Sequence, residues 1–251
     1  MARVVNVADF RVSTFSREMF IRDIWDYKSG DHVTILAPTG GGKTYLSYQL
    51  LGATARPDLQ AVVFVMKPRD ATVSAFSKRF HYKIVRDWPP AVISKMGAQP
   101  AGYVLWPPES DDPEADDRRH TAVFRRALRD CYRNARKGDS KGRIVFADET
   151  YSLEQELNLE NDLRRIWTKG RSMECGLWAG SQRPVYISRW ALQAQHLFLG
   201  NDPDVDMQRR YGEIGGGIDP ALVRGLTAKL KKFQFAYISR EERAICIVDA
   251  N

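Results

Sequence analysis

The stretch from Ala37 to Thr44 combines residues in the order that phosphate binding requires. It reads Ala-Pro-Thr-Gly-Gly-Gly-Lys-Thr, follows the apolar, β-branched run 33–36 and precedes a segment with helical spacing. Glycines let backbone N–H groups close around phosphate oxygens without Cβ clashes, and the positive end of the new helix favours the same anion. This pattern, a P-loop, predicts a site for a nucleoside triphosphate.

The residues of this turn have separate expected roles. The side chain of Lys43 is expected to reach the β- and γ-phosphates, and the hydroxyl of Thr44 to hold Mg²⁺. Ala37 stands where the strict pattern begins with glycine, which is a common variant. The alternative is an ordinary glycine-rich turn between a strand and a helix. The expected nucleotide-binding residues are Pro38, Thr39, Gly40, Gly41, Gly42, Lys43 and Thr44.

Two carboxylates end a second apolar strand, at 142–147. Asp148 is expected to hold the hydration shell of Mg²⁺, and Glu149 to orient and polarise an attacking water. An apolar run that ends in Asp-Glu is common by itself. The catalytic interpretation is strengthened here because the run follows a P-loop in a chain with an alternating α/β pattern.

A third strand, at 176–180, leads to Gln182. The amide of Gln182 offers one acceptor and two donors, which suits a group that touches the γ-phosphate and reports its presence. Without the other motifs, a glutamine on a loop surface would be the ordinary interpretation.

Composition limits the class of protein. The 251 residues suit one α/β domain with decorations, or one domain with a small appendage. With 38 Lys and Arg against 31 Asp and Glu, the net charge of +7 favours a polyanionic partner. The three distant cysteines (131, 175 and 246) indicate a reducing compartment. No apolar run reaches the ~18 residues that span a bilayer, and the N-terminus lacks a secretory hydrophobic region. We expect a cytoplasmic protein.

Hydrophobic periodicity predicts the remaining elements. Residues 1–30 are expected to form an N-terminal arm and an amphipathic helix around 20–25, which either covers the sheet or binds a partner. Residues 31–251 are expected to form the main domain, closed by a C-terminal hairpin at about 233–248. Further strands are expected at 61–66, 83–85, 103–106 and 196–199. Further helices are expected at 71–80, 120–135, 153–167 with a break near Asn158 and Asn161, 204–211 and 221–229.

Several charged groups leave two interpretations open. Lys67 and Arg69 follow a strand, so they either approach phosphates or are solvated turn charges. The acidic stretch 109–117 is either an exposed loop that starts the next helix or a metal site. The arginines at 125, 126, 129 and 133 either contact phosphates or form a solvated helix face.

The segment from Lys169 to Pro184 reads KGRSMECGLWAGSQRP. It resembles the segment of FtsK/HerA-type P-loop ATPases in which Gly-Arg precedes an apolar strand that ends in Ala-Thr-Gln-Arg-Pro. Members of that family are ring-forming DNA pumps of chromosome segregation, conjugation and viral genome packaging. Stretch 191–217, with Gly200-Asn201-Asp202-Pro203-Asp204 and Gly215 to Gly217, is similar to the later part of the family. Gly180-Ser181 replaces the usual Ala-Thr, and no accessory domain is recognisable.

The resemblance implies a three-layer α/β fold of the RecA/ASCE type. Its central sheet is mainly parallel, with strand order 5-1-4-3-2, and the 176–180 strand lies between the P-loop strand and the Asp-Glu strand. ATP and Mg²⁺ are the implied cofactors. The family also completes each site with an arginine from the neighbouring subunit, and Arg171 matches that position. Arg164 and Arg165 are the second choices, with helix-surface charges as their alternative.

We therefore expect an ATPase that translocates double-stranded DNA as a homo-oligomeric ring. A compact member of the family suits viral genome packaging, for which a portal or another packaging protein is an implied partner and the host cytoplasm the implied location. One alternative is a nucleotide-dependent switch or assembly ATPase that moves no DNA. A kinase for a small molecule is less consistent with the Gln-Arg-Pro segment.

Overall fold

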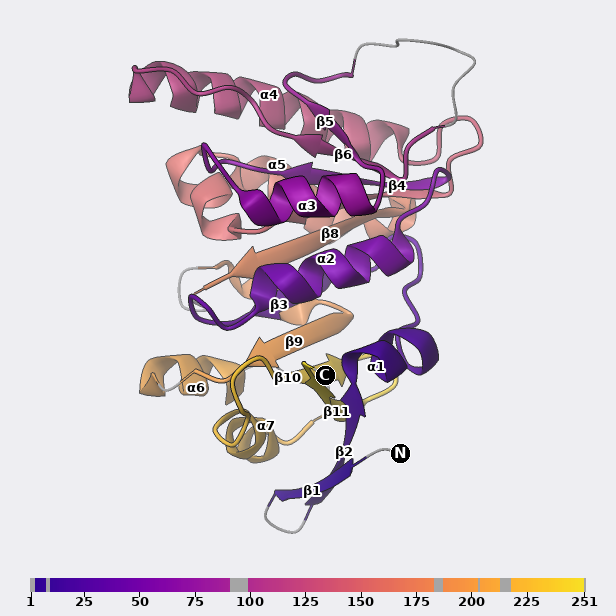
Figure 1. The fold of residues 1–251 in the computed structure, drawn as a ribbon, viewed down its shortest axis with the longest axis vertical. Coiled ribbons are helices and arrows are strands. Elements are labelled where there is room, and N and C mark those ends of the chain that lie inside the picture. The colour runs from indigo at the N-terminus through magenta and orange to yellow at the C-terminus, as the bar shows by residue number, and fades with distance from the viewer. Residues whose placement is uncertain are drawn as a thin grey trace. The chain divides into compact units, whose positions relative to one another are not determined.

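Strands and helices alternate along most of the chain (Figure 1). The computed structural model describes residues 3–7, 10–90, 99–182, 187–202, 204–212 and 218–250. Arg183, Pro184 and the glycines 215–217 of the family-like segments lie outside these ranges.

The strands are β1 (Arg3–Val7), β2 (Phe10–Ser16), β3 (Val33–Leu36), β4 (Leu59–Phe64), β5 (Lys83–Val85), β6 (Gly102–Leu105), β7 (Gly142–Ala147), β8 (Cys175–Ser181), β9 (His196–Gly200), β10 (Phe235–Ser239) and β11 (Ala244–Asp249). The helices are α1 (Arg17–Asp23), α2 (Lys43–Thr54), α3 (Ala71–Arg79), α4 (Pro113–Asn134), α5 (Glu160–Lys169), α6 (Val205–Gly212) and α7 (Pro220–Thr227). A π-helical turn (Ser152–Glu156) and 3₁₀ turns (Arg171–Met173 and Arg189–Gln193) complete the set of named elements.

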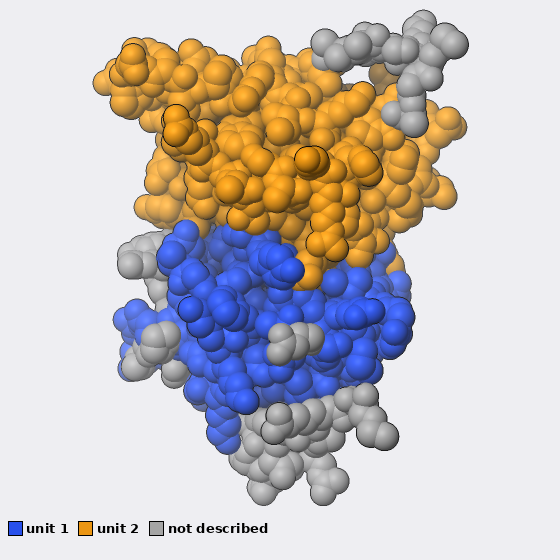
Figure 2. Space-filling model, viewed as in Figure 1, with its two compact units in different colours: residues 1–27, 32–47, 180–251 blue, residues 28–31, 48–179 orange. Residues whose placement is uncertain are grey.

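The chain divides into two units, which Figure 2 distinguishes by colour. The first unit contains residues 1–27, 32–47 and 180–251, and the second contains residues 28–31 and 48–179. The P-loop therefore belongs to the first unit, whereas the Asp148-Glu149 pair belongs to the second.

In the second unit the strands lie in the order β8-β7-β4-β6-β5, and all neighbours are parallel. Every residue of β4 and of β8 is buried. Continuous apolar runs without alternation are typical of parallel strands that are covered on both faces. The apolar runs in the sequence thus predicted these strands to within two residues.

Helices cover both faces of this parallel sheet. On one face, Phe146 of β7 packs against Tyr48, which stacks on Phe76 of α3 with ring centroids 4.3 Å apart. Phe64 of β4 lies opposite Ala147, one position beyond Phe146, so its side chain points to the other face. There it stacks on Phe124 of α4 at 4.9 Å. The second unit is therefore a three-layer α/β/α structure, as expected.

Helix α4 begins earlier than its apolar stripe suggested. Asp112 caps the helix by accepting from the backbone N–H of Ala115, and Pro113 occupies the first turn. Asp116 accepts from Ser110 and from Arg119. The acidic stretch is therefore largely the first turn of a helix, where negative charge is favoured by the helix dipole. The described residues contain no group of three or more His, Cys, Asp or Glu side chains that could hold a metal ion.

In the first unit the strands lie in the order β1-β2-β11-β10-β9-β3. Strands β10 and β11 form the expected antiparallel hairpin, although β10 begins at Phe235, not at Phe233. Helix α1 covers this sheet, because the buried ring of Phe20 contacts Phe198 of β9 and Tyr237 of β10. The interpretation of this helix as a cover for the sheet is thus confirmed.

Each unit contains a part of the expected strand order 5-1-4-3-2. In the first unit, β9 pairs in parallel with β3, which gives 5-1. In the second unit, the order β8-β7-β4 gives 4-3-2. The last two residues of β8 belong to the first unit, where Ser181 accepts from the backbone N–H of Ala37, 3.3 Å away. Within each unit, the observed neighbours agree with the expected order.

Two local expectations can also be compared with the structure. The helix expected at 153–167 is interrupted by Asn158, whose positive φ of 52° separates the π-helical turn from α5. All three cysteines are buried and unpaired, so they form no disulfide. Among the described helices, none has the length and apolar character needed to cross a membrane.

The stack of Phe64 on Phe124 gives a prediction for stability. Phe124 is fully buried, so Phe124→Ala should lower the free energy of unfolding by about 3–5 kcal/mol through lost burial and a residual cavity. Urea denaturation measures this change. Ile84→Ala is the matched control, because Ile84 is 45% exposed and its loss should cost about 0.5 kcal/mol or less. Equal losses in the two variants would contradict the assignment of Phe124 to the core.

Candidate nucleotide site

The turn between β3 and α2 has the backbone of an anion cradle. Gly40 and Gly42 have φ values of +74° and +90°, in the left-handed region that side chains disfavour. The N–H of Gly41 donates to the carbonyl of Pro38 at 2.9 Å, which closes the turn. A Cβ on Gly41 would lie 2.9 Å from that same carbonyl oxygen. The loop therefore depends on its glycines, as the sequence predicted.

Lys43 begins α2 directly after this turn, and its side chain is only 6% exposed. The first turn of α2 contains no acidic residue. A helix start that combines N–H groups, a positive dipole end and a lysine stabilises an anion. The residues present therefore fit a polyphosphate. Thr44 follows on the same turn and supplies the hydroxyl oxygen that a Mg²⁺ site would need.

The alanine at the start of the loop is accommodated by a glycine on the neighbouring strand. Ala37 is fully buried, and Gly200 at the end of β9 faces it. A Cβ on Gly200 would lie 2.8 Å from the Cβ of Ala37, which is closer than two carbons can pack. Gly200 thus provides the space for the methyl group that replaces the glycine of the strict pattern.

Gln182 contacts the P-loop directly. Its side-chain carbonyl oxygen accepts a hydrogen bond of 2.5 Å from the hydroxyl of Thr39. One residue earlier, the backbone carbonyl of Ser181 accepts from Ala37. The backbone makes this second contact, so the replacement of Thr by Ser at 181 leaves it intact. The end of β8 is therefore joined to the phosphate-binding turn by two hydrogen bonds.

The carboxylates of the second unit lie at the end of β7. Asp148 is 18% exposed, and one of its oxygens lies 3.9 Å from Nζ of Lys67, which also pairs with Asp70 at 3.7 Å. Burial raises the pKa of the nearby Tyr48, and the charges of Asp148 and Asp70 raise it further. Lys67 therefore lies beside the expected Mg²⁺ ligand, and Glu149 is the next residue along the chain.

Arg171 is in the 3₁₀ turn that precedes β8, whereas Gln182 follows that strand. The seven residues of β8 span roughly 23 Å at about 3.3 Å per residue, so the two side chains flank opposite ends of the strand. Arg171 lies 3.7 Å from the buried Asp31, and 56% of its side chain remains exposed. A residue in this position can serve a neighbouring subunit only through such an exposed surface.

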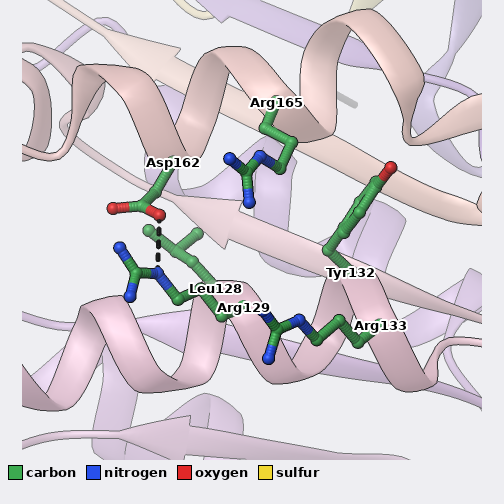
Figure 3. A pocket seen from close by; sticks show the side chains of 6 residues that line it. All are labelled: Leu128, Arg129, Tyr132, Arg133, Asp162 and Arg165. Carbon is green, nitrogen blue, oxygen red and sulfur yellow. Dashed lines mark hydrogen bonds and ion pairs between the residues drawn. The ribbon is translucent and has the colours of Figure 1, made fainter.

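The other arginines make contacts within their own unit. Arg164 donates to Asn161, and Arg165 lines a hollow between α4 and α5 (Figure 3). In Figure 3, Arg129 points to Asp162, to which it donates at 3.0 Å, and Arg125 donates to the other oxygen of Asp162. Arg125 and Arg129 of α4 therefore stabilise the packing of α4 on α5 through Asp162.

The sequence analysis did not identify Phe233 as a residue of the site. The sequence analysis assigned Phe233 to a strand, but it lies in the turn before β10, with a positive φ of 69°. Its ring contacts the P-loop, because a Cβ on Gly42 would lie 3.0 Å from its Cδ1 atom. No local pattern identifies this contact, since the two residues are brought together only by the pairing of β10 with β9 and of β9 with β3.

The parallel sheet, its strand order and the P-loop after β3 define the fold of the P-loop ATPases. No protein-family model matches the chain, and no curated protein matches its sequence. Among solved structures, the chain is similar to B204, the DNA-packaging ATPase from Sulfolobus turreted icosahedral virus. The two share 14% identity with a TM-score of 0.64 over 90% of this chain and 100% of that chain.

Two further solved structures are similar. VirB4 of Thermoanaerobacter pseudethanolicus has 10% identity and a TM-score of 0.64, over 91% of this chain and 92% of that one. The genome-packaging NTPase B204 from Sulfolobus turreted icosahedral virus 2, in complex with ATP-gammaS, has 13% identity and a TM-score of 0.60, over 89% and 98%. These structures confirm the fold that the resemblance implied.

The contact between Ala37 and Gly200 predicts that one substitution is damaging and that a second substitution compensates for it. Gly200→Ala should lower the free energy of unfolding by about 1–3 kcal/mol through overpacking, and should raise the Kd for ATP by distorting the loop. Ala37→Gly removes the opposing methyl group, so the double variant should recover much of both losses. Urea denaturation and ATP binding of the four proteins form a double-mutant cycle. Strictly additive effects would show that the two residues do not constrain each other.

Proposed function

We propose that the chain is an ATP-hydrolysing motor that translocates double-stranded DNA as a homo-oligomeric ring, in genome packaging. Its 31–251 segment acts as the ATPase domain behind an N-terminal arm and helix. The proposal is supported by the geometry of the P-loop, by the placement of Gln182 and by the fold shared with a DNA-packaging ATPase.

The hydrogen bond between Thr39 and Gln182 is the observation that carries this proposal. Thr39 belongs to the turn that would surround the phosphates, and Gln182 ends a strand whose other end leads back to Arg171. A γ-phosphate entering the turn would compete for the donors of both side chains. Loss of the γ-phosphate on hydrolysis would then change the hydrogen bonds of Gln182 at the end of β8. A conformational change of this strand could reach a neighbouring subunit.

The remaining roles follow from the chemistry of the side chains. Lys43 would bind the β- and γ-phosphates, while Glu149 would take a proton from the attacking water. Thr44 and Asp148 offer the oxygen ligands that Mg²⁺ prefers. When bound, Mg²⁺ supplies neutralisation of the phosphate charge. Lys67, beside Asp148, adds a second positive charge at this carboxylate.

The proposed partner is the phosphate backbone of DNA. The net charge of +7 favours a polyanion, and contacts to phosphates are independent of sequence and weaken as salt increases. A similar structure carries the name of a DNA-packaging ATPase. A portal or another packaging protein is the further partner that this function would need.

The decisive experiment compares ATP hydrolysis with and without double-stranded DNA. We expect DNA to stimulate the rate at low salt, and the stimulation to disappear as salt is raised. Glu149→Gln should bind ATP with unchanged affinity but hydrolyse it about 10²-fold or more slowly, because the general base is lost. Steady-state phosphate release and ATP binding measure these quantities.

A rate that DNA leaves unchanged, at concentrations that allow oligomers, would contradict the motor. It would favour a nucleotide-dependent switch or assembly ATPase. Retained hydrolysis in Glu149→Gln would remove that residue from its role without affecting the rest of the proposal.

A second prediction tests whether Arg171 acts on the neighbouring subunit. Arg171→Ala should reduce hydrolysis by ~10³-fold, since charge that develops on the γ-phosphoryl group would lose its stabilisation. Mixing it with inactive Lys43→Ala subunits should restore activity, because some interfaces then combine an intact P-loop with an intact Arg171. Arg164→Ala is the matched control and should leave the rate unchanged. Mixtures that stay inactive would contradict a role for Arg171 between subunits.

A further inference from the structure

Two exposed aromatic side chains flank the P-loop. Of the side chains that the structure describes, the large apolar ones with high exposure are Tyr45 at 55%, Ile84 at 45% and Phe233 at 41%. Tyr45 directly follows Lys43 and Thr44, and the ring of Phe233 reaches Gly42. Single exposed apolar residues are normal on a protein surface, but two of them beside the same phosphate-binding turn indicate one shared apolar surface. We call Tyr45 and Phe233 the aromatic pair.

The backbone of Phe233 is held in a strained conformation. Its φ of 69° is unfavourable for a bulky side chain, and such strain persists where the surroundings impose it. A tight turn holds it in place: the N–H of Gln234 donates to the carbonyl of Lys231 at 3.0 Å, and the N–H of Lys231 donates to the side chain of Gln234 at 2.8 Å. Gln234 is anchored in turn to Asp249 of β11 at 2.9 Å. The turn thereby keeps an apolar ring in solvent beside Gly42.

Arg17 connects the two members of the aromatic pair. This side chain is 3% exposed, and its guanidinium lies 5.7 Å from the centroid of the Tyr45 ring. Its Nη2 atom donates to the backbone carbonyl of Phe233 at 3.0 Å. One buried cation thus contacts both aromatic residues from the start of α1, and the pair is held on elements of the first unit.

The aromatic pair lies on the side of the P-loop toward which the nucleoside of a bound nucleotide would extend. In a P-loop, Lys43 approaches the β- and γ-phosphates while backbone groups surround the α- and β-phosphates. The nucleoside of a bound triphosphate would therefore leave the turn beyond the α-phosphate, past the first turn of α2, to which Tyr45 belongs. Aromatic rings stack on the face of a nucleobase, and they suit a surface that is partly apolar and partly wet.

We propose that Tyr45 and Phe233 bind the base of the nucleoside triphosphate by stacking. This inference rests on the proposed function, because it requires that the P-loop binds the phosphates of the same ligand. It adds a base-binding surface to a site whose phosphate-binding residues were evident from the sequence.

Binding of ATP and of inorganic tripolyphosphate to the full chain, both with Mg²⁺, separates the two parts of the site. The wild-type protein should bind ATP more tightly than tripolyphosphate. Tyr45→Ala and Phe233→Ala should each raise the Kd for ATP by about 5- to 160-fold, which is the range for loss of one stacked aromatic ring. Both variants should leave the Kd for tripolyphosphate unchanged. Ile84→Ala shortens an apolar side chain whose exposure lies between those of Tyr45 and Phe233, and it should change neither Kd.

Phe233→Gly distinguishes a loss of nucleotide binding from a loss of stability. Glycine accepts the positive φ at position 233 without strain, so this variant should unfold at the same temperature as the wild type or higher, while its Kd for ATP rises as in Phe233→Ala. Unchanged affinity for ATP in Phe233→Gly would overturn the inference, as would an equal rise in both Kd values, which would assign Phe233 to the shape of the P-loop.

Three other outcomes would also decide against it. Unchanged ATP binding together with weaker DNA binding or loss of the oligomer would assign the pair to a macromolecular contact. If the wild type bound neither ATP nor tripolyphosphate, the proposed function would fail and the inference with it. Binding of tripolyphosphate as tightly as ATP would overturn the base site alone.

Discussion

The turn between β3 and α2 must direct successive backbone N–H groups toward one anion, and this requirement shapes everything packed around it. Gly40 and Gly42 adopt left-handed backbone conformations that residues with a Cβ disfavour. The neighbouring strand contributes Gly200, whose lack of a side chain admits the methyl group of Ala37. The conformation of one short loop therefore depends on small residues that are distant in the sequence, because a close-packed interior has no spare volume.

The layered architecture explains why the polar residues directly follow the strands. Parallel strands that are covered on both faces leave only their ends open to solvent, so chemistry is confined to the loops that follow them. The loops after β3, β7 and β8 carry the P-loop, Asp148 and Gln182 respectively. Aromatic packing on opposite faces, around Phe146 of β7 and around Phe64 of β4, supports the sheet of the second unit, in which β7 ends next to Asp148.

Most of the fold was predictable because its signals are local. Continuous apolar runs identified the buried strands, and the glycine-rich turn identified the phosphate-binding loop. Helix α4 begins before its apolar stripe, because its first turn is acidic and lacks the apolar spacing that periodicity detects. The interpretation of the acidic stretch as a loop that starts this helix is confirmed, and the cap by Asp112 fixes where the helix begins. The start of β10 was wrong for a related reason, since Phe233 is apolar like a strand residue but has a positive φ.

The sequence by itself determined the kind of site: the P-loop residues, the carboxylates after β7 and the glutamine after β8 are recognisable by type and order. Tertiary structure alone decided which of them touch. The hydrogen bond between Thr39 and Gln182, the space that Gly200 leaves for Ala37 and the ring of Phe233 against Gly42 all join distant segments. Strand pairing creates these contacts, and no local pattern encodes them, because the free energy of each depends on packing between residues that the chain brings together only when it folds.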